Sequence, residues 1–486
     1  MPNHDEEMNR RREKREALRK KRQAEQRRMK LALAAALVVL ILCGVGIFFI
    51  ARSAGVTLQT GETEAASTRA TEANRATQPT QPTQPTAPQR GAKTTIHIKA
   101  AGDLNITDAV VNAGMPTGNF DYTRAFLDVA ATMADADLTV LNFEGTLSGE
   151  PYGTERSSAP REILDGLRNM GVDLVQTANT CSINNGLIGL SSTLSAIRNS
   201  GLEPLGSYAS TAEFQQSKGY TLCDVQGVKV AFVAFTKGFG GMGLPAGNEN
   251  SVNLLYEDYD STYKKINKTG INSILKAVEA EKPDITIAML HWGSEYNESI
   301  SKTQEDIVEL MQKGGVDVII GSHPHLLQTI YHDRMAGTLV AYSLGDFFGD
   351  GTRGGSNYSV ILDLEITKDP ELGTTKVTDF TFTPIYTLQI SENEGDYKYS
   401  RIVRIREAMD AYNNNYVDKV TKSAYDAMEY AMKRINERIA EEKIVECPEC
   451  EEDLEILVNN LGKLVNEKTC KCGKTLEAGS NYADYD

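Results

Sequence analysis

The sequence predicts an α/β fold, and two observations predict it. From residue 94 to residue 347, short apolar runs rich in β-branched residues alternate with stretches whose apolar residues recur at helical spacing. Two more strand-like runs, at 358–367 and 376–388, then follow each other directly, which predicts an antiparallel tail. Helices should therefore cover the sheets, and the tail indicates a core with two sheets.

The individual elements follow from the same patterns. Apolar, β-branched runs predict strands at residues 94–103, 137–145, 172–179, 228–236, 284–293, 316–320 and 339–347. Helical periodicity predicts helices at about 122–134, 161–170, 263–281 and 303–313. Together with the tail, these elements define a main domain over residues 94–390.

Charge divides the 486-residue chain into a basic N-terminus and an acidic remainder. Residues 1–52 carry 13 Lys or Arg against 6 Asp or Glu, whereas the other residues carry 38 against 60. Binding to nucleic acid depends on clustered Lys and Arg that neutralise phosphates. The acidic remainder therefore indicates that nucleic acid is not a partner.

An uncharged apolar stretch, residues 31–51, follows the basic N-terminus. As a helix it would measure about 31 Å, which matches the hydrocarbon core of a bilayer. Lys and Arg are abundant before it and only Arg52 directly follows, so residues 1–30 should form a cytoplasmic basic arm that contacts anionic lipid. We predict a single-pass signal anchor in the cell membrane, with the main domain extracytoplasmic; a cleaved signal peptide is the alternative.

Residues 52–93 predict a disordered linker. They are rich in Thr, Ala, Gln, Glu and Pro and include the repeat QPTQPTQPT that begins at Gln78. A segment of this composition buries no core and acts as an extended spacer.

Six polar residues lie just past the ends of predicted strands. In α/β sheets, ligand sites form where the carboxyl ends of parallel strands meet. Carboxylate, amide and imidazole groups together suit divalent ions such as Mn, Fe or Zn. We therefore predict a metal site formed by Asp103, Glu144, Asn179, His291, His323 and His325.

Six segments carry a resemblance to a known family. In chain order they are AGDLN, DLTVLNFEGTL, GVDLVQTANTCSINNGLIGL, LHWGSEY, GVDVIIGSHPHLLQ and AYSLGDFF. Over about residues 96–350 they resemble the CapA family of bacterial capsule and poly-γ-glutamate synthesis proteins, within the calcineurin-like metallophosphoesterase superfamily. The resemblance implies a four-layer α/β/β/α sandwich and a role in synthesising or anchoring such a polymer.

The resemblance also implies a two-metal site. Asp103 and His325 would hold one ion, His291 and His323 the other, and Glu144 would lie between them. Two ions of this kind activate a water and bind the oxygens of a phosphoryl group. The implied activity is metal-dependent hydrolysis of a phosphoester.

One segment departs from the family pattern, which usually has ANNHxxDxG where this chain has ANTCSINNG. Thr180 replaces an Asn that is a metal ligand in superfamily enzymes, and Cys181 replaces a His that donates a proton or steadies the phosphate. Asn184 stands where the family usually has Asp, and Asp346 stands where it usually has Asn. Asn179 or Asn184 could act as the ligand instead, and no catalytic residue is assigned.

The C-terminal region predicts a helical segment and a small metal-binding domain. Residues 391–443 contain a charged amphipathic pattern. This pattern predicts a helical segment that either packs on the main domain or binds a partner. Over residues 444–486, two close cysteine pairs have the spacing of a structural zinc ribbon. These ligands are Cys447, Cys450, Cys470 and Cys472. Disulfides between the pairs are the alternative, because the topology places them outside the cell.

Two hypotheses on function remain open. The first is a membrane-anchored, metal-dependent hydrolase that acts on a cell-envelope polymer or another phosphoester. The second is a noncatalytic accessory or binding subunit that works with other subunits of a polymer-synthesis complex. The altered segment at Thr180 and Cys181 favours the second, and the retained histidines and carboxylates favour the first.

Overall fold

The computed structural model describes residues 92–115, 118–391, 398–415, 420–450 and 452–482. They belong to a compact unit that spans Thr86–Asp486. The predicted basic arm, membrane anchor and nearly all of the predicted linker lie outside the described residues. Within those residues, no helix has both the length and the apolar character needed to cross a membrane.

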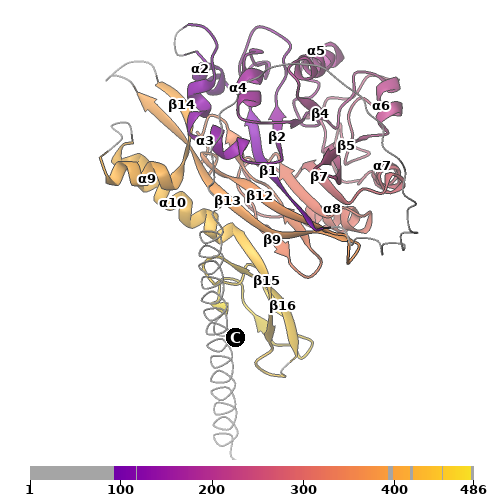
Figure 1. Cartoon of the computed structure of the whole chain (residues 1–486), viewed down its shortest axis with the longest axis vertical. Helices are drawn as coiled ribbons and strands as arrows, with labels where there is room; N and C mark the ends of the chain where they lie inside the picture. Colours follow the sequence, from indigo (N-terminus) through magenta and orange to yellow (C-terminus); the bar gives the residue numbers. More distant parts are fainter. Residues whose placement is uncertain (1–91, 116–117, 392–397, 416–419, 451, 483–486) are drawn as a thin grey trace, which may run out of the picture. The chain divides into compact units, whose positions relative to one another are not determined.

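Two eight-stranded sheets form the centre of this unit (Figure 1). The first has the order β14-β13-β12-β1-β2-β3-β4, and β11 pairs with β1. Its strands are β1 (Thr94–Asn105), β2 (Leu138–Glu144), β3 (Leu174–Gln176), β4 (Glu203–Leu205), β11 (Asp346–Phe348), β12 (Tyr358–Asp369), β13 (Thr374–Ser391) and β14 (Lys398–Arg404). Strands β1, β2, β3 and β4 pair in parallel in that order. On the other side of β1, the strands β12, β13 and β14 are added in antiparallel pairs.

The second sheet has the order β16-β15-β9-β10-β8-β7-β6-β5. Its strands are β5 (Tyr220–Val225), β6 (Val228–Thr236), β7 (Ile285–His291), β8 (Val318–Ser322), β9 (Ile330–Asp333), β10 (Thr338–Ala341), β15 (Ile439–Glu446) and β16 (Asp453–Asn459). The strands β6, β7, β8 and β10 are parallel, and the edges are antiparallel.

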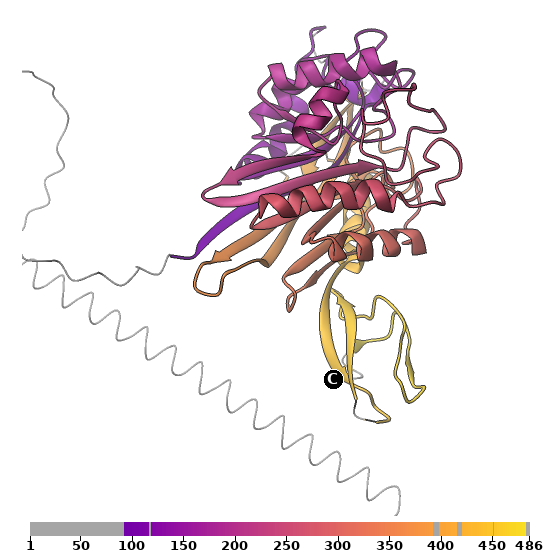
Figure 2. The same ribbon diagram turned by 90° about the vertical axis from the view of Figure 1, so that its right-hand side faces the viewer.

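Helices cover the outer faces of both sheets (Figure 2). The first sheet packs on α2 (Asp108–Ala113), α3 (Thr123–Ala134), α4 (Ile163–Asn169) and α5 (Gly186–Asn199), and the second on α7 (Lys268–Glu281) and α8 (Lys302–Lys313). The short α6 (Thr211–Ser217) lies before β5. The mixed α/β fold predicted from the sequence is confirmed.

Strand β2 shows why the central strands are mainly apolar on both faces. All seven of its residues are buried. Leu138 and Val140 join the core between the two sheets, whereas Leu141 and Phe143 join the core beneath the helices. Because side chains alternate between the faces of a strand, a sheet covered on both sides needs a continuous apolar run.

Aspartates fix the parallel strands at the end opposite to the predicted site. Each precedes its strand directly and accepts a hydrogen bond from a backbone N–H of the neighbouring strand. The carboxylates of Asp137, Asp173, Asp284 and Asp317 accept at 2.7–2.8 Å from His97, Thr139, Lys229 and Thr286, respectively. These bonds satisfy backbone N–H groups near the beginnings of the strands and hold the strands in register. The register in turn determines where the carboxyl ends of the strands lie.

The C-terminal boundaries differ from those predicted. Residue 390 falls inside β13, and β14 continues the first sheet as far as Arg404. In the described part of the predicted helical segment, helices occupy only α9 (Ile405–Asn413) and α10 (Lys422–Arg438). Strand β15 follows α10 and pairs in parallel with β9, so the second sheet continues into the cysteine-rich region (Figure 1).

Candidate metal centre

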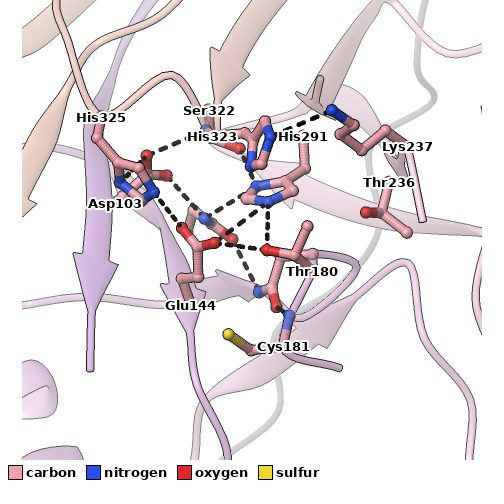
Figure 3. A network of polar contacts seen from close by, with 12 residues as sticks. Asp103, Glu144, Thr180, Cys181, Thr236, Lys237, His291, Ser322, His323 and His325 are labelled. Carbon is pink, nitrogen blue, oxygen red and sulfur yellow. Dashed lines mark hydrogen bonds and ion pairs between the residues drawn. The ribbon is translucent and has the colours of Figure 1, made fainter. Parts of the chain in front are cut away.

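The carboxyl ends of strands from both sheets meet at one place (Figure 3). Asp103 lies near the end of β1, Glu144 ends β2, and His291 ends β7. His323 and His325 follow β8 in the turn that contains Pro324. All five side chains are buried, with at most 4% of any residue exposed. The structure thus brings together five of the six residues predicted as ligands.

The turn that carries the two histidines is strained. His323 has a φ of 91° and His325 a φ of 58°, values that non-glycine residues rarely adopt. Two hydrogen bonds hold it: the backbone N–H of His323 donates to Asp103 Oδ2 (3.0 Å), and that of Tyr296 donates to the Pro324 carbonyl (2.9 Å). The rings of His323 and His325 then lie with centroids 6.1 Å apart.

Glu144 lies between the histidines. Its Oε1 is 3.3 Å from His291 Nε2 and accepts a hydrogen bond from the Thr180 hydroxyl (2.7 Å). Its Oε2 is 3.9 Å from His325 Nε2 and has no hydrogen-bond partner among the described residues. The Nδ1 atom of His323 is also buried without a described partner. Buried polar atoms left in this state are costly unless a ligand satisfies them.

These side chains form two overlapping groups whose ligand atoms lie within 4.8 Å of one another. One group is Glu144, His291 and His323, and the other is Asp103, Glu144 and His325. Glu144 is common to both. A third group joins the exposed Glu295 to His323 and His325. Carboxylate oxygens and imidazole nitrogens at this density are a donor set that suits divalent transition metals.

The side chains of the cluster shift one another's pKa values strongly: despite burial, His291 and His325 hold the pKa of Glu144 below its usual range. Burial and the nearby charge of Glu144 raise the pKa of Asp103 well above its usual value. Burial alone would lower the pKa of His325, but Asp346, Glu144 and Asp103 outweigh it and raise that pKa well above the ordinary value. Burial, with His291 beside it, lowers the pKa of His323 well below the usual range. A cation among these groups would relieve the repulsion between the carboxylates.

Three supporting residues were not predicted from the sequence as part of the site. Asn142 donates to Asp103 Oδ1 (2.7 Å), and Ser322 Oγ lies 2.9 Å from His291 Nδ1. Asp346 Oδ1 lies 2.7 Å from His325 Nδ1. Contacts of this kind orient ligand side chains around metals. A sequence signal exists for Asn142, which is two residues before Glu144 on the same face of β2.

The altered segment after β3 is arranged differently from the prediction. Asn179 was predicted as a ligand, but its Nδ2 donates to Asn142 Oδ1 (3.1 Å) and to the Phe143 carbonyl (2.7 Å). Its Oδ1 accepts from the backbone N–H of Cys181 (3.1 Å). Thr180 faces the cluster instead, with its Oγ1 3.1 Å from His291 Nε2. The side chain of Asn179 is thus engaged in holding the segment.

Neither of the other residues in this segment replaces the missing imidazole. Burial and the charge of Glu144 raise the pKa of the Cys181 thiol to about 12, so the thiol stays protonated at neutral pH. Asn184 Nδ2 donates to Ser157 Oγ (3.1 Å), and this contact lies in the loop beyond the cluster.

A second cluster lies in the C-terminal region. The Sγ atoms of Cys447 and Cys472 are 3.6 Å apart, and those of Cys450 and Cys470 are 3.5 Å apart. All four cysteines are free, and their sulfurs lie within 4.8 Å of one another. The backbone N–H groups of Glu449 and Cys450 lower the pKa of Cys447 to about 7, which favours its thiolate, whereas at Cys450 and Cys470 the neighbouring thiols and burial outweigh the backbone hydrogen bonds and raise the pKa. The predicted cysteine cluster is thus present, beside a small core that includes Val445, Leu454 and Leu464.

Comparisons with known proteins agree with the sequence resemblance. The model of a family described as "Bacterial capsule synthesis protein PGA_cap" matches residues 97–350. The capsule biosynthesis protein CapA of Bacillus anthracis is 30% identical over 193 residues, which are 40% of this chain and 44% of that protein. The PGA biosynthesis protein CapA of Bacillus subtilis is 29% identical over 191 residues, 39% of this chain and 46% of the relative. The matched part thus spans less than half the length of these relatives.

The matches among solved structures are more distant in sequence. The calcineurin-like phosphoesterase YfkN of Bacillus subtilis is 15% identical, covers 70% of this chain and 100% of its own, and gives a TM-score of 0.34. A phosphatase from Mycoplasma pneumoniae is 13% identical, covers 61% of this chain and 95% of its own, and gives a TM-score of 0.37.

Proposed function

Because the chain belongs to the PGA_cap family of bacterial capsule synthesis proteins, we propose that it acts in making or anchoring a capsule or poly-γ-glutamate at the cell envelope. Residues 31–51 would anchor it in the cell membrane as a single span, and residues 52–93 would extend the folded unit away from the lipid. The described domains would then lie outside the cytoplasm, where the envelope polymer and other synthesis subunits are accessible.

The cluster at the strand ends is proposed to be a two-metal site of the phosphoesterase type. The observation that carries this proposal is the buried carboxylate of Glu144, which belongs to both ligand groups and whose Oε2 has no hydrogen-bond partner among the described residues. Asp103 and His325 would hold one divalent ion and His291 and His323 the other, with Glu144 serving both. Bound ions would supply an activated water and neutralise the oxygens of a phosphoryl group.

The chain's own residues would hold these ligands in place. Asp346 would fix the ring of His325 through Nδ1 and leave Nε2 directed towards Glu144. Ser322 would do the same for His291, whose Nε2 faces Glu144 and Thr180. We assign Asn179 to positioning, since its amide secures the segment that carries Thr180.

Phosphodiester hydrolysis by the purified full-length chain in detergent tests this proposal. With Mn²⁺ supplied, bis(p-nitrophenyl) phosphate should be turned over, and His291→Ala should abolish that turnover. The matched control is His97→Ala, which removes a half-exposed histidine at the other end of the first sheet. Turnover that persists in His291→Ala would refute a hydrolase that works through this site.

One observation favours a second candidate, a noncatalytic binding subunit of the polymer-synthesis complex. The position that usually carries an imidazole holds the Cys181 thiol, which stays protonated at neutral pH and is a poor proton donor to a leaving group. In this case the metal centre would bind an anionic polymer without cleaving it. Bound metal without turnover in the assay above, together with retention of poly-γ-glutamate that depends on His291, would select this candidate.

The four cysteines of the C-terminal region are proposed to hold one structural zinc ion. Four sulfurs that converge from two close pairs provide the tetrahedral donor set that zinc prefers. The small core beside them buries few residues, so a metal would supply much of the stability of this region.

A further inference from the structure

A lysine that the sequence did not single out lies beside the metal centre. Lys237 follows β6, and its backbone N–H donates to the carbonyl of His291 (2.8 Å). Its Nζ donates to the Gly293 carbonyl (2.7 Å), lies 3.4 Å from His323 Nε2 and stands 4.8 Å from the centre of the Tyr263 ring. Figure 3 shows the side chain reaching His323 from the side opposite to His325.

The charge of the ammonium group of Lys237 is compensated only at longer range, by the exposed carboxylate of Glu295. The lysine is half-buried, and it forms no salt bridge with any residue that the structure describes. The distance from Lys237 Nζ to His323 Nε2 is long for a hydrogen bond, so the Gly293 carbonyl is the one well-placed acceptor of this ammonium group among the described residues. A partly desolvated cation with unused donors is costly for the fold, and this cost points to a role in binding an anion.

A second cation lies on the other side of the histidine turn. The ring of Tyr296 is 5.4 Å from that of His325, and the guanidinium of Arg353 lies 5.2 Å from the centre of the Tyr296 ring. Tyr296 is 40% exposed and Arg353 is exposed, so this pair forms the rim next to His325. Stacking on the ring restricts the guanidinium to the neighbourhood of the centre while its N–H groups remain available.

We propose that Lys237 and Arg353 bind the oxyanions of the substrate from opposite sides of the metal centre. Lys237 would contact the anionic group nearest to the ions, and Arg353 would contact a neighbouring anionic group of the same molecule. The site would then select a substrate with repeated oxyanions, either phosphoryl or carboxylate groups. This inference rests on the proposed metal centre and adds to it the residues that recognise charge.

Calorimetric titration of the Mn²⁺-loaded full-length chain in detergent tests the proposal, with inorganic phosphate and glutarate as separate probes. Lys237→Met should weaken binding of the preferred probe about tenfold or more, because a charge-assisted hydrogen bond is lost. Arg353→Met should weaken it about threefold, because this contact is exposed. Lys237→Arg should retain most of the affinity, and Lys264→Met, which alters the exposed lysine that follows Tyr263, should bind as the unmodified chain does.

Each outcome decides a separate point. Preference for phosphate would identify a phosphoryl substrate, whereas preference for glutarate would identify a carboxylate polymer; a loss in Lys237→Met supports the proposal in both cases. Unchanged affinity in Lys237→Met, with its Mn²⁺ content intact, overturns the proposal and leaves the metal centre standing. Loss of Mn²⁺ from that variant would show that the lysine only maintains the site, which also overturns it. A chain that binds no Mn²⁺ refutes the proposed function and this inference together.

Discussion

Replacing Asp317 with Asn should make the protein more stable at neutral pH. Asp317 directly precedes β8, the strand that leads into the two histidines, and its Oδ2 accepts a hydrogen bond from the backbone N–H of Thr286 (2.8 Å). Burial raises the pKa of this carboxyl to about 6 from a usual value of 3.8. The amide oxygen of Asn can accept the same hydrogen bond without carrying a charge.

The size of the stability change, and the pH range over which it develops, follow from that pKa. Because the folded protein binds this proton more tightly than the unfolded chain does, the contribution of Asp317 to stability falls as the pH rises from about 4 to about 6. It stays low above pH 6. A difference of about two pKa units corresponds to about 3 kcal/mol. Asp317→Asn should therefore raise the free energy of unfolding by up to about 3 kcal/mol at pH 7 and by much less at pH 4.

Urea unfolding of residues 92–486 at several pH values measures this difference. Subtracting the unfolding free energy of the unmodified protein from that of the variant at each pH removes the contribution of the other titrating groups, since they are common to both. Asp137→Asn is the matched control, because Asp137 makes the same kind of bond at an exposed position. An Asp317→Asn variant that is less stable at pH 7, or a difference that does not change with pH, would refute the reasoning.

Three further predictions concern the two proposed metal sites and the loop between β7 and α8. Asp346→Ala should weaken Mn²⁺ binding about 10–100-fold in a competition titration, because His325 Nδ1 loses the partner that orients its ring; unchanged affinity would contradict this. Cys450→Ser should remove one zinc ion per chain by elemental analysis, whereas Cys223→Ser should not; zinc retained in Cys450→Ser would argue against the four-cysteine site. Glu298→Gln should lower the unfolding free energy by about 1 kcal/mol, since the half-exposed Glu298 pairs with two arginines of α10; no loss in urea unfolding would show that these ion pairs contribute nothing.

Much of the metal centre was predictable because it follows from strand order. Glu144 and His291 end apolar runs whose length and composition identify buried strands, and parallel strands present their ends at one edge. The role of Asp346 was not predictable in this way. Its contact with His325 depends on the pairing of β11 with β1, which brings together residues far apart in the chain.

Asn179 and Thr180 show a limit of the same reasoning. Both follow β3, and nothing in their order along the chain says which one turns towards the site. The hydrogen bond from the Asn179 amide to the Phe143 carbonyl decides it, and that bond depends on how β2 and β3 lie side by side.

The C-terminal region shows how tertiary contacts override local preference. The residues of β15, IAEEKIVE, are rich in Ala, Glu and Lys, which favour helices, and the sequence pattern predicted a helix as far as residue 443. The structure ends α10 at Arg438, because Ile439 and Ala440 are buried where β15 pairs with β9. The helix α5 was not predicted, since Ile188 in its first turn puts an apolar residue on the exposed face (88% exposed) and so obscures the helical spacing of the apolar residues.

Elemental analysis of the full-length chain, purified with Mn²⁺ and Zn²⁺ supplied, tests the central claim most directly. The account predicts two ions at the strand-end cluster in addition to the zinc held by the cysteines. Glu144→Ala should lose both cluster ions, because this carboxylate belongs to both ligand groups, and should keep the zinc. A chain that holds only the cysteine-bound zinc, or a Glu144→Ala variant with its full metal content, would contradict the account.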